Sequence, residues 1–138
     1  MVRVAQRSDV EAMMRIRAAV KENRLVSRVI PASEVIDQIE RTGRGWVAQV
    51  EREIVGFSVG NAENGSIWAL FVDPEYARRG FGRQLHDVML DWLWSQGLDS
   101  LWLTTEPGTR AERFYRIAGW SDCGVDSKGE RRFERTRL

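Results

Sequence analysis

The chain has 138 residues, of which 43% are hydrophobic and 30% are charged, and its 21 basic and 20 acidic side chains leave a formal net charge of +1. This balance is typical of a folded protein and argues against nucleic acid as a partner, because nucleic-acid-binding domains normally carry a marked basic excess. The length predicts a single domain over residues 1–138.

Cysteine content and hydropathy predict the compartment. The single cysteine, Cys123, cannot form an intrachain disulfide, which permits a reducing environment. No histidine lies near it in sequence to activate it, so we interpret Cys123 as a small strand residue rather than a nucleophile. The chain shows no signal-peptide pattern and no apolar run of about 18 residues. We therefore expect a cytoplasmic protein without a membrane span.

Hydrophobic patterning predicts strands and helices in the first half of the sequence. Ser8 and Glu11 have the spacing of a capping box, so we expect Ser8 to be the N-cap of the first helix. The segment 54–60 alternates apolar with small residues, as a half-buried strand does, and Asn64-Gly65 is typical of a hairpin turn. The other expected elements are a strand at 2–5, a helix from 31 to about 43, and a strand at 45–51.

The segment 67–72 is apolar on both faces, which predicts a strand at the centre of the sheet. His86, the single histidine, falls on the polar side of the following helix, so we expect it to be exposed. A strand at 101–105 follows, and this strand–helix–strand order predicts a parallel pair with a right-handed connection. The helix packs through apolar residues at helical spacing: Leu85, Val88, Met89 and Trp92.

The last quarter of the sequence predicts a helix and a hairpin. Pro107 and Thr109 are suited to begin a helix that carries Tyr115. Strands at 120–125 and 131–138 are expected to turn at 126–129. The fold class predicted from these elements is mixed α/β.

A basic, glycine-containing loop separates the strand at 67–72 from its helix. It reads Arg78-Arg79-Gly80-Phe81-Gly82-Arg83. A helix start leaves backbone N–H groups unpaired and carries a partial positive charge, and the arginines add donors suited to phosphate oxygens. The loop lacks the Gly-Lys-Ser/Thr of a Walker A motif and the third glycine of a dinucleotide fingerprint, because position 85 is Leu. It therefore predicts a seat for a different phosphate or pyrophosphate ligand.

Two segments in register resemble the signature of the GNAT superfamily, the acyl-CoA-dependent N-acetyltransferases. Val72-Asp73-Pro74 with the Arg79-Gly80-Phe81-Gly82 loop resembles the acetyl-CoA loop of that family. Ala111-Glu112-Arg113-Phe114-Tyr115 with Gly119-Trp120 resembles its second helical motif. The resemblance implies a GNAT-like fold: a mixed, mostly antiparallel central sheet flanked by helices, with a splayed parallel strand pair that holds the pantetheine arm.

The resemblance also implies which residues bind acetyl-CoA. Backbone groups of Leu70, Phe71 and Val72 would pair with the pantetheine amides. The backbone N–H groups of Arg78, Arg79, Gly80, Phe81, Gly82 and Arg83 would hold the pyrophosphate. Thr109 stands where many members carry Asn, and Phe114 would pack along the cofactor. Tyr115 occupies the position of the general acid that protonates the departing thiolate. No metal is expected.

The general base and the acceptor remain open. Many relatives carry a Glu on the strand before the pyrophosphate loop, and this chain has no carboxylate between Ile67 and Val72. Gln84 also departs from the family, which usually has Gly or Ala there. The candidate bases are Glu22, Asp73, Glu106 and Asp122, or none of them. We expect a small-molecule or peptide amine as the acceptor, and a monomer or a homodimer.

The leading function is therefore transfer of an acetyl group from acetyl-CoA to a primary amine, with Tyr115 as general acid. The missing strand Glu leaves a non-catalytic acyl-CoA-binding or sensing domain as the alternative. A third interpretation is a protein-interaction module that uses the six tryptophans, although core and pocket lining explain them more simply.

Overall fold

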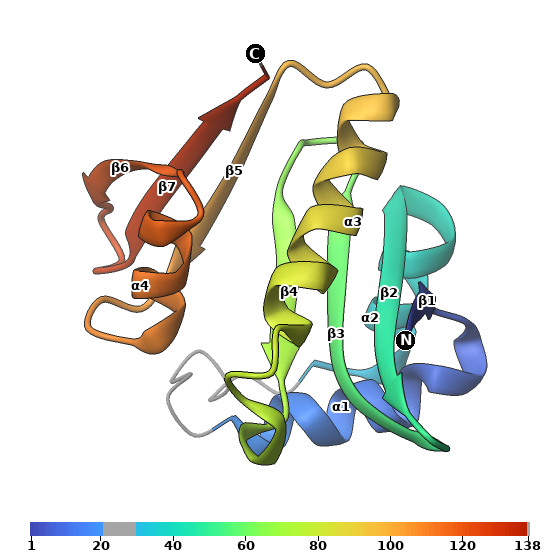
Figure 1. Ribbon diagram of the computed structural model, residues 1–138. Coiled ribbons are helices and arrows are strands. Elements are labelled where there is room, and N and C mark those ends of the chain that lie inside the picture. The colour runs from blue at the N-terminus through green and yellow to red at the C-terminus, as the bar shows by residue number, and fades with distance from the viewer. Residues whose placement is uncertain (21–29, 138) are drawn as a thin grey trace.

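The computed structural model describes residues 1–20 and 30–137. Its strands form two antiparallel sheets, one in the order β1-β2-β3-β4 and the other in the order β5-β7-β6 (Figure 1). The mixed α/β fold class and the mostly antiparallel pairing are confirmed. The strands are β1 (Val2–Val4), β2 (Gly43–Val50), β3 (Glu53–Asn61), β4 (Ile67–Val72), β5 (Ser100–Thr105), β6 (Ser121–Val125) and β7 (Arg131–Thr136). The helices are α1 (Val10–Ala19), α2 (Ala32–Asp37), α3 (Phe81–Ser95) and α4 (Arg110–Ile117), and a π-helical turn, Gln38–Thr42, extends α2.

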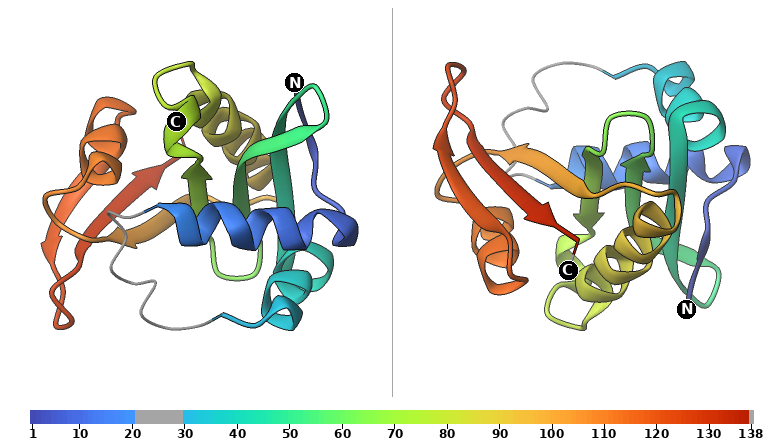
Figure 2. Two further views of the ribbon diagram at one scale, coloured as in Figure 1. Left: turned by 90° about the horizontal axis from the view of Figure 1, so that it is seen from below. Right: turned by 90° about the horizontal axis from the view of Figure 1, so that it is seen from above.

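Helices cover both faces of the four-stranded sheet. α3 packs on β2, β3 and β4, whereas α1 packs on β3 and β4 from the opposite face (Figure 2). Residues that alternate along β2 consequently enter different cores: Trp46 and Ala48 belong to the cluster beneath α3, and Val47 to the cluster beneath α1. This alternation is the period of two expected for a strand. The first cluster continues through Leu101 and Phe133 into the second sheet.

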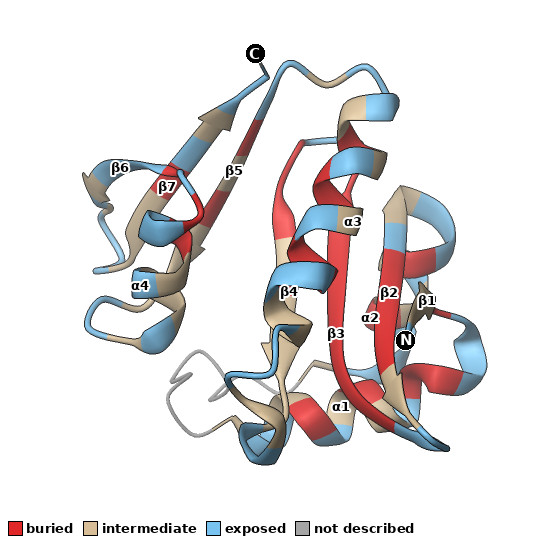
Figure 3. Ribbon diagram, viewed as in Figure 1, coloured by how far each residue is buried: buried red, intermediate tan, exposed pale blue. Residues whose placement is uncertain are grey.

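The burial of β3 and β4 differs from the sequence prediction. β3 is buried at every position from Ile54 to Asn61, so the expectation of a half-buried strand is wrong (Figure 3). The physical reason is that helices lie on both of its faces. β4 was expected at the centre of the sheet, but it forms one edge and only two of its six residues are buried. Its apolar outer residues line the cavity described below.

The two sheets meet at the start of β4 and β5. A single isolated parallel bridge joins Ser66 to Trp102, and the Trp102 N–H donates to the carbonyl of Gly65 at 3.0 Å. Within the described part of the chain, the expected parallel pairing is limited to this bridge. Beyond it, β4 and β5 diverge toward their carboxyl ends (Figure 1).

α3 lies close on β3 because glycines face it. A Cβ added to Gly60 would come within 2.9 Å of Leu93 Cδ1 and 3.1 Å of Met89 Cγ. The buried stripe of α3 follows from this contact and includes Leu85, Met89 and Leu93. Val88 and Trp92, which were expected in the same packing face, are half-buried at its border.

The N-terminal end of the first helix differs from the expected capping box. A 3-10 turn, Arg7–Asp9, precedes α1, and the reciprocal cap joins Gln6 to Asp9 rather than Ser8 to Glu11. The Asp9 carboxylate accepts the Gln6 backbone N–H at 2.8 Å. It also accepts hydrogen bonds from both terminal nitrogens of Arg3, each at 2.9 Å. Asp9, a carboxylate paired with Arg3, is a stronger hydrogen-bond acceptor than the Ser8 hydroxyl, and it therefore determines where the helix begins.

We expect Asp9→Asn to lower the free energy of unfolding by about 2 kcal/mol, because it weakens charge-assisted hydrogen bonds to a nearly buried carboxylate. The Arg3 guanidinium holds the pKa of Asp9 below its usual value. The stabilisation is therefore present above about pH 4 and lost as pH falls through the folded-state pKa. Urea unfolding of the wild type and of Asp9→Asn at pH 7 and pH 3 measures this difference in unfolding free energy. Asp37→Asn is the control, since its exposed ion pair with Arg41 should contribute less than about 0.5 kcal/mol.

Candidate active site

A cavity of about 680 Å³ lies between the diverging strands β4 and β5. Its position follows from the fold, because the two strands share one bridge at their beginnings and no ladder beyond it. The volume falls in the range of about 300–1,000 Å³ that is usual for ligand pockets. Among the described residues, the lining comes from the end of α1 (19–20), β4 (67–72), the loop after it (74, 76–78), the start of α3 (80–83), the end of β5 and the loop after it (103–106), and α4 with its N-cap (109–111, 114, 115).

The start of α3 lines the cavity through residues 80–83. Gly80 is its N-cap and has a φ of +86°, a left-handed conformation that glycine adopts without steric cost. The N–H of Gln84 donates to the Gly80 carbonyl at 3.1 Å and closes the first helical turn. The N–H groups of Phe81, Gly82 and Arg83 precede it and therefore have no helical partner. Their positive potential predicts an anion seat, as the sequence did.

The arginines of the loop take different positions. Arg78 lines the cavity and has a φ of +65°, which is unusual for a residue with a side chain. Arg83 also lines it and pairs with Asp87 at 3.2 Å. Arg79 is not among the lining residues, and its guanidinium lies 5.1 Å from the centre of the Tyr76 ring.

The beginning of α4 and its aromatic residues also line the cavity. Thr109 is the N-cap, as predicted: its hydroxyl oxygen accepts the Glu112 N–H at 3.3 Å and its hydroxyl donates to the Glu106 carbonyl at 2.8 Å. Phe114 and Tyr115 both line the cavity, with their ring centres 5.3 Å apart in an edge-to-face arrangement. Tyr115 is 6% exposed, and its burial raises the pKa of the phenol. Its hydroxyl is therefore protonated at every physiological pH.

The sequence profile of the acetyltransferase (GNAT) family matches residues 12–120, which is more than half of the chain and includes both segments that line the cavity. The chain belongs to the GNAT family. It is accordingly an acyl-CoA N-acyltransferase by class, which confirms the resemblance seen in the sequence. No curated protein matches the sequence significantly.

Solved structures share this GNAT fold at low sequence identity. The PaiA N-acetyltransferase of Thermoplasma acidophilum in complex with coenzyme A superposes with a TM-score of 0.84 at 15% identity, over 99% of this chain and 98% of that one. A ribosomal-protein-alanine N-acetyltransferase of Brucella melitensis gives 0.82 at 18%, over 99% of each chain. YncA of Salmonella typhimurium, a putative acetyltransferase with its cofactor acetyl-CoA, gives 0.83 at 14%, over 99% and 92%.

His86 of this GNAT protein is buried, so the prediction of an exposed histidine is wrong. Its side chain is 1% exposed. The indole N–H of Trp120 donates to His86 Nε2 at 3.0 Å, and His86 Nδ1 lies 2.8 Å from Asp87 Oδ1. The sequence did contain a signal, because His86 is four residues before Leu90, which is also buried. The buried stripe of α3 is wider than the expected face, since α3 also contacts Phe114, Tyr115 and Trp120 through His86.

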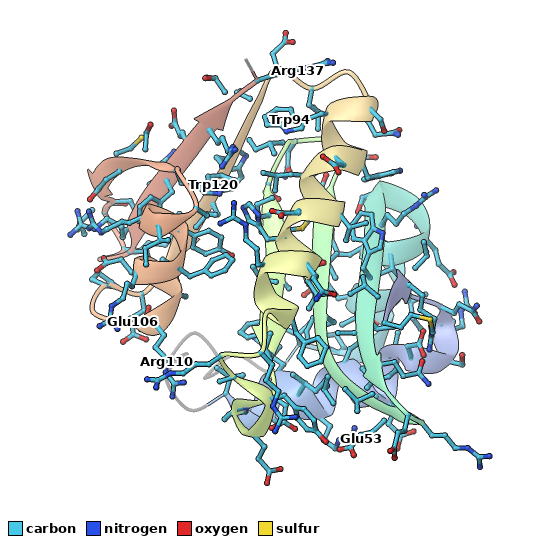
Figure 4. The ribbon with its side chains drawn as sticks, in the orientation of Figure 1. Glu53, Trp94, Glu106, Arg110, Trp120 and Arg137 are labelled. Atoms are coloured by element: carbon cyan, nitrogen blue, oxygen red, sulfur yellow. The ribbon has the colours of Figure 1, made fainter. Side chains whose placement is uncertain are left out.

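The four candidate bases of this GNAT protein are separated by their positions. Glu22 lies outside the described residues. Asp73 accepts a backbone N–H two residues onward at 3.0 Å and does not line the cavity. Asp122 pairs with two arginines, at 2.8 Å and 3.2 Å, and is also outside the lining. Glu106 does line the cavity, at the loop between β5 and α4, and Figure 4 shows it with Arg110 near the lower end of α4.

The tryptophans pack within the molecule. None of the six is among the exposed large hydrophobic residues. Trp46 and Trp92 meet edge to face at 5.7 Å, and the Trp102 indole N–H donates to the carbonyl of Asn64 at 2.9 Å. Trp68 lines the cavity. This packing supports the core and pocket-lining role expected for them and gives no support to a tryptophan-based interaction module. Within the described residues, no cluster of three or more metal-ligating side chains occurs, and no helix has the length and apolar character needed to cross a membrane.

Proposed function

We propose that this protein is a single N-acetyltransferase domain, over residues 1–138, that transfers the acetyl group of acetyl-CoA to the primary amine of a small-molecule or peptide acceptor. The observation that carries the proposal is the cavity between β4 and β5, which is lined both by the unpaired N–H groups at the start of α3 and by Tyr115. The family assignment supplies the reaction class. Cytoplasmic location, the lack of a nucleic-acid partner and the monomeric or dimeric state stay predictions from the sequence.

The edge of β4 would hold the pantetheine arm of acetyl-CoA. On one side, Leu70, Phe71 and Val72 are paired with β3. On the other side β4 lines the cavity, and along an antiparallel edge strand alternate residues point their backbone N–H and C=O groups outward. An extended arm with amide groups can pair with such an edge as another strand would. Phe114 would then pack along the arm, and Thr109 would hold the start of α4 against it.

The start of α3 would hold the pyrophosphate. The N–H groups of Phe81, Gly82 and Arg83 point from the helix end, and the Arg78 and Arg83 side chains line the same part of the cavity. Gly80 shapes the turn, and Arg79 contributes its backbone N–H while its side chain rests on Tyr76. Charge-assisted hydrogen bonds of this kind are worth about 1.5–3 kcal/mol each.

The cavity residues also suit the chemistry. A bond forms between the amine nitrogen and the acetyl carbon, and the bond from that carbon to sulfur breaks. We propose that Glu106 accepts the amine proton, because it is the one candidate base among the described residues that lines the cavity. Tyr115 donates its hydroxyl proton to the departing sulfur and regains one from the solvent. General acid–base assistance of this kind contributes about 10²–10⁴-fold.

Release of thiol from acetyl-CoA in the presence of a panel of amines tests the proposal. We expect amine-dependent thiol release, and a decrease in kcat of about 10²-fold or more in Glu106→Gln. Asp73→Asn is the matched control, because Asp73 does not line the cavity. Calorimetry with acetyl-CoA completes the design. If acetyl-CoA binds and no amine is acetylated, the alternative of a non-catalytic acyl-CoA-binding or sensing domain replaces the transferase, and if acetyl-CoA does not bind, both fail.

A further inference from the structure

His86 and Trp120 connect the two parts of the molecule that enclose the cavity. His86 is on α3, which packs on the four-stranded sheet, whereas Trp120 follows α4 and begins the hairpin of the three-stranded sheet. Their hydrogen bond therefore crosses between the walls of the cavity, away from the Ser66–Trp102 bridge at the start of β4 and β5. Trp120 lies between α4 and α3 (Figure 4).

The direction of this hydrogen bond fixes the protonation of His86. An indole nitrogen is a donor only, so His86 Nε2 must accept and carries no proton. The proton of the neutral imidazole is therefore on Nδ1, which donates to Asp87 Oδ1 at 2.8 Å. A second proton on Nε2 would face the Trp120 N–H directly. Protonation of His86 is thus incompatible with the hydrogen bond that joins the two walls.

The same pair packs against Phe114 and Tyr115, the two aromatic residues of α4 that line the cavity. The His86 ring centre is 5.5 Å from Phe114 and 6.5 Å from Tyr115. Trp120 contacts Tyr115 twice: the rings meet edge to face at 5.7 Å, and the Trp120 backbone N–H donates to the Tyr115 carbonyl at 3.0 Å. His86 does not line the cavity, so it acts there only through these neighbours.

We propose that His86 is a positioning residue of the transferase: as a neutral imidazole that accepts the Trp120 indole hydrogen bond, it holds the Tyr115 ring at the reacting end of the cavity. The inference rests on the proposed function of the cavity. It goes beyond it by naming a buried residue on which the placement of Tyr115 depends, and it makes activity sensitive to pH through a group that never touches the substrates.

The groups around His86 set the pH at which its imidazole becomes protonated. Burial lowers the pKa of His86, Asp87 opposes that effect, and the positive charges of Arg135 and Arg83 add to it. Tyr115 faces the ring from α4 and stays neutral. A histidine in the unfolded chain titrates near pH 6.5. Because the folded-state pKa is lower, the unfolded chain binds more protons, so stability is full above about pH 6.5 and decreases as pH falls below it.

Nitrogen-15 NMR of the full chain tests the tautomer directly, because the protein has one histidine. We expect the Nδ1–H tautomer and a pKa below 6.5. In Trp120→Phe the opposing N–H is removed, so the pKa of His86 should rise by about one pH unit. An Nε2–H tautomer, or a pKa that is identical in the two proteins, would overturn the proposal. This arm needs no substrate, so it separates failure of the inference from failure of the proposed function.

Kinetics test the positioning role. His86→Phe keeps a ring and loses the acceptor, and we expect kcat to fall about tenfold with KM for acetyl-CoA changed by less than about threefold. His86→Gln provides an amide oxygen that accepts the Trp120 hydrogen bond, and its side chain does not titrate. It should therefore keep kcat near the wild-type value and abolish the decrease in activity that protonation of His86 causes at acid pH. If His86→Phe has wild-type kcat and pH profile, the inference is wrong. If that variant does not fold, the His86 tautomer and the change of the His86 pKa in Trp120→Phe still test the proposal.

Discussion

Tyr115→Phe is expected to lower kcat by about 10²–10⁴-fold while acetyl-CoA binds with nearly unchanged affinity. The substitution removes one oxygen atom from a ring that otherwise packs against Trp120 and Phe133. These apolar contacts persist in the variant, so the fold and the walls of the cavity are retained. The lost group is the hydroxyl that donates to the departing sulfur, and that interaction exists only once the carbon–sulfur bond breaks. The cost therefore falls on kcat rather than on binding.

The raised pKa of Tyr115 gives this prediction a second part. Burial keeps the phenol protonated well above pH 9, whereas a free thiol has a pKa of about 8.5. Deprotonation of Tyr115 should therefore cause no decrease in kcat up to pH 9. It also means that the phenolate left after proton transfer is a stronger base than the thiolate, so Tyr115 regains a proton from the solvent as soon as the carbon–sulfur bond has broken.

Steady-state kinetics from pH 6 to pH 9, with acetyl-CoA binding followed by calorimetry, measure both parts. Tyr76→Phe is the matched control, because it removes the hydroxyl of the other tyrosine, which lies beside the arginine loop. It should change kcat far less than Tyr115→Phe. A Tyr115→Phe protein with wild-type kcat would show that another donor protonates the sulfur, or that the thiolate leaves without one.

The starts of α3 and α4 could be predicted from sequence because each depends on a few neighbouring residues. Gly80 and Gly82 stand at the junction of a strand and a helix, and the structure gives that junction unpaired N–H groups. Thr109, with Pro107 just before it, was expected to begin α4, and it is the N-cap of that helix. Local chemistry decides such features, so local sequence contains them.

The features that sequence reasoning missed depend on partners far along the chain. His86 was assigned to a polar helix face, but Trp120, 34 residues later, covers it and donates its indole N–H to the imidazole. β4 was assigned to the centre of a sheet from its composition. Both of its faces do pack against helices, but its unpaired edge lines the cavity, and that edge follows from the pairing order of the strands. A hydrophobic pattern indicates that a surface is covered, but it does not indicate which part of the chain or which ligand covers it.

Gly82→Leu is expected to weaken acetyl-CoA binding by at least about 100-fold, the loss of two charge-assisted hydrogen bonds of about 1.5 kcal/mol each. A Cβ at position 82 would lie 3.7 Å from Phe114 Cε1 and 3.7 Å from Val72 Cγ2, which are ordinary contacts. Both neighbours line the cavity, so the rest of a leucine side chain would extend into the space proposed for the pyrophosphate and the adjoining arm.

The same substitution should leave the free protein equally or more stable to unfolding. A loss of acetyl-CoA binding can then not be attributed to a loss of folded protein. Gly82 is in the first turn of α3 and does not have a positive φ, so a residue with a Cβ fits its backbone. Glycine within a helix costs about 0.5–1 kcal/mol relative to alanine, and leucine is also a good helix former. Thermal unfolding of the free protein should therefore give an equal or higher Tm, while calorimetry shows the loss of binding.

Gln84→Leu controls for added apolar volume in the same helical turn, because Gln84 is exposed and outside the cavity lining. It should leave acetyl-CoA affinity within about threefold of the wild-type value, as expected for a surface substitution that touches no ligand. Gly82→Ala should give an intermediate loss, since one methyl group enters the seat. If Gly82→Leu binds acetyl-CoA as the wild type does, the diphosphate does not lie on the first turn of α3, and the proposed orientation of the cofactor must be reversed or abandoned. The transferase class rests on the family match and would survive that result; the assignment of Tyr115 to the reacting end would not.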